Sequence, residues 1–169
     1  MTKLIWITGL AGSGKTTLAK EVYMQLKKMY PNVVIIDGDH LREIFGGTTG
    51  YSTEERLENA RRLSRLCHFL VSENIHVVCA TMSLYKEIQE WNKKHIPEYF
   101  EIFLDIPMSS LIKRDKKGLY SAALKGEMEN VVGVNQSWDK PESPFMVVQE
   151  FQMNELPKLA SEIIKKVNF

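Results

Sequence analysis

A phosphate-binding loop is the first stretch of this sequence whose residues can do chemistry. It matches G-x-x-x-x-G-K-[ST] and lies between an apolar run and a helical segment. Its glycines let the backbone curl so that successive N–H groups point at a phosphate chain, and the following helix adds its positive dipole end. Lys15 can reach the β- and γ-phosphates of ATP, and the Thr16 hydroxyl can ligate Mg²⁺. The predicted ATP-binding residues here are Gly9, Ala11, Gly12, Ser13, Gly14, Lys15, Thr16 and Thr17.

Two aspartates at the end of a second apolar run form the next candidate. Asp37 and Asp39 flank a glycine directly after Val33–Ile36. One carboxylate can orient Mg²⁺ or its waters, and the other can accept the proton of an attacking hydroxyl. Alternatively, both are only turn or helix-cap residues. Because the phosphate loop is expected beside them, we favour function and predict that Asp39, Asp37 and Lys15 are catalytic.

Cations and one aromatic residue can hold an anionic acceptor. Arg42, Arg56, Arg61 and Arg62 carry guanidinium groups that match phosphate-like groups, although most arginines on such a helix are solvated. Asn59 shares a helical face with Arg56. Tyr51 can stack on a base or serve as a hydrophobic staple.

A long segment from about 116 to 144 is rich in Lys, Gly, Asn and Pro, as is typical of a functional lid. Arg114, Lys116 and Lys117 lead into it. These cations can neutralise a transferring phosphoryl group, or they can form a solvated basic patch.

Alternating strands and helices must position these residues. Continuous β-branched runs are typical of parallel strands that are covered on both faces, and ligands bind beyond the carboxyl ends of such strands. We therefore predict an α/β fold, a three-layer sandwich with a central parallel sheet, in one domain spanning 1–169. The expected strands are Leu4–Thr8, Val33–Ile36, His76–Thr81, Phe100–Ile106 and Phe145–Gln149. The expected helices cover about 15–29, 53–73 (beginning at Ser52 or Thr53 with Glu55), 85–94, 109–114 and 154–167.

Composition narrows the class of protein. The chain has 169 residues, 44% apolar and 25% charged, with a net charge of +1, so nothing draws it globally toward nucleic acid or a membrane surface. Cys67 and Cys79 are expected to be reduced and buried. The sequence shows neither a secretory signal nor an apolar run of membrane-spanning length, so we expect a cytoplasmic location by elimination.

Several motifs together resemble the adenylylsulfate kinase (APS kinase) family of P-loop kinases. They are WITGLAGSGKTTLA, IDGDHLR, GYSTEERLENARRLSRL, and FLDIP followed by RDKKGLY. The resemblance implies an ATP- and Mg²⁺-dependent kinase with a nucleoside-monophosphate-kinase-like fold, usually a homodimer. It implies transfer to the ribose 3′-hydroxyl of a nucleotide whose 5′-phosphate carries a second acid group in anhydride linkage. By position, Asp39 resembles the catalytic carboxylate. The implied acceptor-site residues are Asp39, Arg42, Tyr51, Arg56, Asn59, Ser83, Lys117, Leu119 and Val131, and Arg114 joins the ATP site.

Departures from the family pattern concentrate around the acceptor's base. Val131 stands where the family has a base-stacking phenylalanine, and Asn135 stands where it has an aspartate. Leu84 and Lys86 replace the proline and arginine of I-S-P-Y-R. This pattern resembles an offshoot of the family, the cytidine diphosphoramidate kinases of bacterial capsule synthesis. An adenylylsulfate kinase of sulfate assimilation is the alternative acceptor class, and a nucleotide-binding ATPase switch is the alternative from another class.

Overall fold

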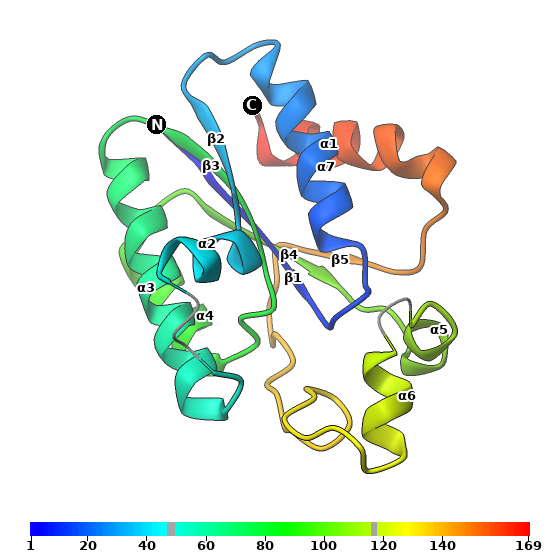
Figure 1. Ribbon diagram of the computed structural model, residues 1–169. Helices are drawn as coiled ribbons and strands as arrows, with labels where there is room; N and C mark the ends of the chain where they lie inside the picture. The colour runs from blue at the N-terminus through cyan, green and yellow to red at the C-terminus, as the bar shows by residue number, and fades with distance from the viewer. Residues whose placement is uncertain (47–49, 116–117) are drawn as a thin grey trace.

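Five parallel strands form a central sheet in the computed structural model, which describes residues 1–46, 50–115 and 118–169 (Figure 1). The strand order is β2-β3-β1-β4-β5. The predicted parallel sheet is confirmed. The strands are β1 (Leu4–Gly9), β2 (Val33–Asp37), β3 (His76–Thr81), β4 (Tyr99–Leu104) and β5 (Met146–Val148).

Helices cover both faces of this sheet (Figure 1). Helices α1 (Lys15–Lys27) and α7 (Leu156–Val167, after the 3₁₀ turn η1, Met153–Glu155) lie on one face. Helices α3 (Thr53–Ser72) and α4 (Lys86–His95) lie on the other. Side chains alternate along β1, so Ile5 and Ile7 join the first core and Leu4 and Trp6 join the second. The predicted three-layer sandwich is therefore confirmed.

The amino end of α3 is fixed by its own sequence. Ser52 Oγ accepts a hydrogen bond from the Glu55 N–H at 3.3 Å, and Glu55 Oε2 accepts one from the Ser52 N–H at 3.1 Å. This capping box was predicted from the serine and the glutamate three residues later. It fixes the chain next to Tyr51, whose ring lies against Arg42 and Arg56.

Two short helices depart from the sequence-based expectation. Helix α2 (Gly38–Ile44) begins directly after β2, where only a turn or cap was considered, because the Asp37 side chain caps it. Helix α6 (Leu119–Leu124) lies inside the segment 116–144, so the expectation of an irregular lid was wrong there. It forms because Tyr120 and Ala123 bury themselves against the first core. Helix α5 (Met108–Lys113) precedes it, close to the expected 109–114.

Smaller corrections concern strand ends and cysteines. β4 begins one residue earlier and ends two residues earlier than the expected Phe100–Ile106. Cys67 and Cys79 are free and buried, as predicted. Among the described residues, no helix is both long and apolar enough to cross a bilayer.

Candidate active site

The phosphate loop joins β1 to α1 through positions that only glycine fills easily. Gly14 caps α1 with φ 96°, and a Cβ there would lie 3.1 Å from Cζ of Phe151. A Cβ on Gly9 would lie 2.9 Å from the Leu104 carbonyl oxygen. The Ser13 N–H turns back to the Leu10 carbonyl at 3.2 Å. The loop therefore curls tightly enough for its amides to surround a phosphate group.

Lys15 lies at the centre of the charges in this region. Its Nζ donates to the Leu10 carbonyl at 2.9 Å. Burial lowers the pKa of Lys15 to about 8, while the nearby carboxylates of Asp39 and Asp37 act in the opposite direction. The structure thus brings the predicted lysine close to both predicted aspartates.

Asp37 has two partners. Its Oδ2 accepts a hydrogen bond from the Thr16 hydroxyl at 2.6 Å, and its Oδ1 accepts one from the Asp39 N–H at 3.0 Å. The second bond caps α2, so Asp37 is a helix-cap residue as well as a neighbour of the phosphate loop. Asp39, in the first turn of the helix, has an exposed side chain. A hydroxyl of a bound acceptor can therefore reach it.

Beyond the aspartates, two arginines flank one aromatic ring. The Arg42 and Arg56 guanidinium carbons lie 4.6 and 5.1 Å from the centre of the Tyr51 ring. Arg42 donates to the Gly50 carbonyl at 2.9 Å, and Arg56 donates to the Tyr51 carbonyl at 3.0 Å. Asn59 Nδ2 is buried without a hydrogen-bond partner among the described residues. These side chains form a cationic wall with an unpartnered amide donor nearby.

The end of β3 supplies hydroxyl groups to the same edge of the sheet. β3 lies between β1 and β2, where Thr8 pairs with Thr81 and Asp37 pairs with Ala80. Ser83, a predicted acceptor-site residue, is buried and lies with its Oγ 2.8 Å from Oγ1 of Thr81. These hydroxyls therefore lie at the carboxyl edge of the sheet, between the ends of β1 and β2.

Tyr85 lies close to Arg56 and Arg42, although the sequence reasoning did not name it as a candidate. It is half-buried at the start of α4. Burial raises its pKa, and the charges of Arg56 and Arg42 only partly offset that rise. The signal that could have revealed it is its position two residues after Ser83 and four residues after the end of β3.

The remaining predicted residues are distributed along the lid. Arg114 pairs with Glu150 at 2.7 Å, Leu119 begins α6, and Val131 is 2% exposed within the first core. Lys116 and Lys117 lie outside the described residues. The roles of these residues stay predictions. Arg61 and Arg62 were considered as clamps, but Arg61 pairs with Glu87 of α4 and Arg62 pairs with Glu58 one turn earlier on α3.

Helix α6 is bonded to the phosphate loop. The Tyr120 hydroxyl, on an otherwise buried side chain, donates to the Ala11 carbonyl at 2.7 Å. Figure 1 shows α6 and the yellow chain after it beyond the lower ends of the strands, beside the loop that follows β1. The lid therefore borders the place where the donor phosphates would lie.

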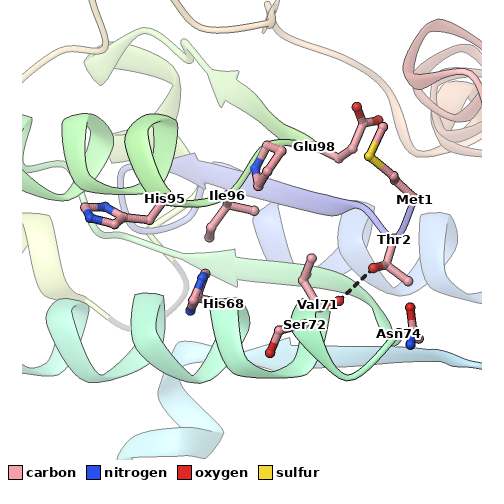
Figure 2. Close-up of a pocket in the computed structure, with 10 residues that line it drawn as sticks. Met1, Thr2, His68, Val71, Ser72, Asn74, His95, Ile96 and Glu98 are labelled. Atoms are coloured by element: carbon pink, nitrogen blue, oxygen red, sulfur yellow. Dashed lines mark hydrogen bonds between the residues drawn. The ribbon is translucent and has the colours of Figure 1, made fainter.

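A separate pocket lies at the opposite end of the sheet (Figure 2). It is lined by residues that precede β1, β3 and β4, including Thr2, Asn74 and Glu98, and by His68 and His95 from α3 and α4. The Thr2 hydroxyl donates to the Val71 carbonyl there at 2.7 Å. Because the phosphate loop follows the carboxyl end of β1, this pocket is not part of the candidate active site.

Comparison with known proteins bears on this arrangement. The profile of the adenylylsulphate kinase family matches residues 1–149. The chain belongs to this family. A cytidine diphosphoramidate kinase of Campylobacter jejuni is 42% identical over 97% of this chain and 95% of its own length. A probable adenylyl-sulfate kinase of Aeropyrum pernix is 35% identical over 86% of this chain and 81% of its own length.

A solved structure agrees with the fold. The APS kinase of Mycobacterium tuberculosis, determined in complex with AMPPNP and APS, superposes with a TM-score of 0.89 at 29% identity. The superposition covers 99% of this chain and 98% of that one. The chain is thus a P-loop kinase of the APS kinase family, a phosphotransferase that acts on a hydroxyl group. The predicted family, fold and enzyme class are confirmed.

Proposed function

We propose that this kinase transfers the γ-phosphoryl group of ATP to the ribose 3′-hydroxyl of a nucleotide that carries a 5′-phospho-anhydride group. The observation that carries the proposal is the placement of Asp37 and Asp39 beside the phosphate-loop residues Thr16 and Lys15. A carboxylate next to the donor phosphates is what an attacking hydroxyl requires. An ATPase switch would need neither this exposed carboxylate nor the cationic wall of Arg42, Arg56 and Tyr51, which we call the acceptor wall.

In the proposed reaction, the amides from Gly9 to Thr17 hold the ATP phosphates, and Lys15 contacts the β- and γ-phosphates. Asp39 accepts or orients the proton of the 3′-hydroxyl as that oxygen attacks in line. Arg42 and Arg56 hold the acidic end of the acceptor, with Asn59 and Ser83 as further polar contacts. Lid cations, Arg114 and Lys117 among them, neutralise the developing charge.

The residues present fit a magnesium ion. Hydroxyl and carboxylate oxygens are ligands that Mg²⁺ prefers, and Thr16 Oγ1 and Asp37 Oδ2 lie 2.6 Å apart at the end of the phosphate loop. Thr16 would hold the ion directly, and Asp37 would hold it directly or through its waters. When bound, Mg²⁺ offsets the negative charge of the β- and γ-phosphates.

For the acceptor we favour cytidine diphosphoramidate, used in capsular phosphoramidate synthesis. The Campylobacter jejuni relative supports this choice because its similarity covers almost the whole chain. The acceptor wall supports it too, since Val131 is buried in the core and leaves Tyr51 as the aromatic surface, 60% exposed. Loss of one stacking face costs about 1–3 kcal/mol per base, which weighs against the larger purine.

Adenylylsulfate is the alternative acceptor, because the Aeropyrum pernix relative and the Mycobacterium tuberculosis structure are APS kinases. The test is kcat/KM for both acceptors with ATP and Mg²⁺, using purified protein and chromatographic detection of the 3′-phosphorylated product. We expect a large preference for cytidine diphosphoramidate. A large preference for adenylylsulfate would reverse the choice of acceptor, and ATP turnover with no phosphorylated nucleotide would support the switch.

We also propose that the enzyme is a homodimer that acts in the cytoplasm, where ATP and Mg²⁺ are supplied, and that it binds no nucleic acid. The dimer follows from the family resemblance. Light scattering on the purified protein tests it, with a mass of one chain, 19.5 kDa, as the contrary result.

A further inference from the structure

One asparagine closes a loop in the lid. Asn135 Oδ1 accepts a hydrogen bond from the Val131 N–H at 2.7 Å, and its Nδ2 donates to the Met128 carbonyl at 2.8 Å. Both the oxygen and the nitrogen of the amide are hydrogen-bonded, so the side chain links the backbone at Met128 to the backbone at Val131. Between those points Asn130 adopts a left-handed conformation with φ 59°. An aspartate at position 135 could accept from Val131 but could not donate to Met128.

The closed loop, residues 128–135, contacts the acceptor wall at one arginine. The Asn130 carbonyl, inside the loop, accepts a hydrogen bond from Arg56 Nη2 at 3.1 Å. On its other side Arg56 Nε donates to the Tyr51 carbonyl. These bonds use two of the five N–H groups of the guanidinium, and Arg56 has no other bond among the described residues. The guanidinium is thus held between the Tyr51 carbonyl, just before α3, and the Asn130 carbonyl of the lid. Its other N–H groups remain able to donate to a ligand.

A second contact fixes the loop against the same helix. Gln136 follows Asn135 in the chain, and its Nε2 donates to Thr53 Oγ1 at 2.8 Å. The loop and the residue that follows it therefore have one bond to Thr53 at the start of α3 and one to Arg56 a turn later. Its shape, set by Asn135, determines where the Asn130 carbonyl lies.

We propose that Asn135 is a positioning residue that acts through Arg56 to set the acceptor's binding geometry. Its amide holds the left-handed turn that presents the Asn130 carbonyl, and that carbonyl holds the Arg56 guanidinium in the place where the acidic end of the acceptor binds. The inference rests on the proposed function, because it assumes that Arg56 contacts the acceptor. Asn135 itself touches neither substrate.

Steady-state kinetics on Asn135→Asp and Asn135→Ala test the proposal, with Ser137→Ala as a matched control on an exposed residue of the same segment. We expect the acceptor KM to rise about tenfold in both Asn135 variants while the KM for ATP stays within twofold. The control should equal the wild type. Circular dichroism and thermal melting establish that each variant is folded, and Asn135→Asp keeps the bond to Val131 if Asn135→Ala is unstable.

A double-mutant cycle with Arg56→Ala separates positioning from a general structural role. If Asn135 acts through Arg56, then Asn135→Asp should change the acceptor KM little in the Arg56→Ala background. An equal tenfold rise in both backgrounds, or an unchanged acceptor KM in the single variants, would overturn the inference. Failure of the wild type to phosphorylate either nucleotide acceptor would instead overturn the proposed function, so the two failures are distinguishable.

Discussion

The Thr16 hydroxyl donates a 2.6 Å hydrogen bond to the Asp37 carboxylate, joining the first turn of α1 to the end of β2. The same carboxylate caps α2, the helix that carries Asp39. The phosphate loop and the candidate catalytic base, Asp39, are therefore connected through the side chain of Asp37.

Replacement of Asp37 by asparagine should separate its two roles. Asparagine caps helices about as well as aspartate, so Asp37→Asn should keep the thermal stability near that of the wild type. The lost charge should weaken Mg²⁺ affinity about 10–100-fold. A magnesium titration of kcat tests this, with melting temperature as the control. An unchanged titration curve would remove Asp37 from the metal site.

Asp39→Asn should lower kcat about 10²–10⁴-fold, the usual contribution of a general base. Asp39 is exposed, so the fold and the affinity for ATP should change little. Single-turnover transfer and equilibrium binding of an ATP analogue measure the two effects separately. Near-normal transfer would exclude Asp39 as the base.

Lys15 should make ATP binding pH-dependent. Its pKa is about 8 in the protein without nucleotide, and the ATP phosphates favour its charged form, which raises that pKa on binding. The affinity for ATP should therefore be constant below pH 8 and fall about tenfold per pH unit as pH rises above it. Lys15→Arg should bind with no such decline, because arginine stays charged. Calorimetric titrations from pH 7 to 9.5 test this, and parallel curves for both proteins would contradict it.

Tyr120→Phe should loosen the contact between α6 and the phosphate loop. The variant loses the 2.7 Å bond to the Ala11 carbonyl, which should cost about 1 kcal/mol of unfolding free energy. The KM for ATP should rise severalfold, since the lid then holds the loop less firmly, while the acceptor KM stays constant. Urea unfolding and kinetics measure both effects. Tyr23→Phe, at a partly buried position in the second half of α1, is the matched control.

Glu101 should make stability depend on pH. Its side chain is 1% exposed, and burial raises its pKa above the usual 4.5, against the opposing charge of Lys93 and a contact with the Tyr99 hydroxyl. The folded protein therefore prefers the protonated acid, and this preference costs stability as pH rises through the unfolded pKa toward the folded one. Glu101→Gln should stabilise the fold by about 1 kcal/mol at pH 7 and by nothing below pH 4.

Urea unfolding at both pH values measures this difference. Glu90→Gln, at an exposed position of α4, is the control and should show no stabilisation at either pH. Equal unfolding free energies of wild type and Glu101→Gln at pH 7 would contradict the prediction that the buried carboxylate destabilises the fold.

Local signals in the sequence predicted most of the fold. Continuous apolar runs predicted the strands, and Ser52 with Glu55 predicted the start of α3, because both depend on neighbouring residues alone. α6 was missed because six residues do not form a helix by propensity; burial of Tyr120 and Ala123 against a distant core stabilises it.

The candidate site was predictable in part for a similar reason. Residues that follow strands directly, such as Asp37 and Ser83, meet at one edge whenever the strands are parallel. The contacts of Arg56 could not be predicted, since they depend on how a lid carbonyl 74 residues away is placed. Tyr85 was missed because an aromatic residue at a helix start is usually a packing residue.

The lid is attached to the two halves of the site by different residues. Tyr120 bonds to the phosphate loop, whereas Asn130 and Gln136 bond to α3. Substitutions at Asn130 or Gln136 can therefore alter the contact with α3 while the Tyr120 bond to the phosphate loop is kept. A kinase built this way can exchange one nucleotide acceptor for another during evolution while its donor site is inherited unchanged.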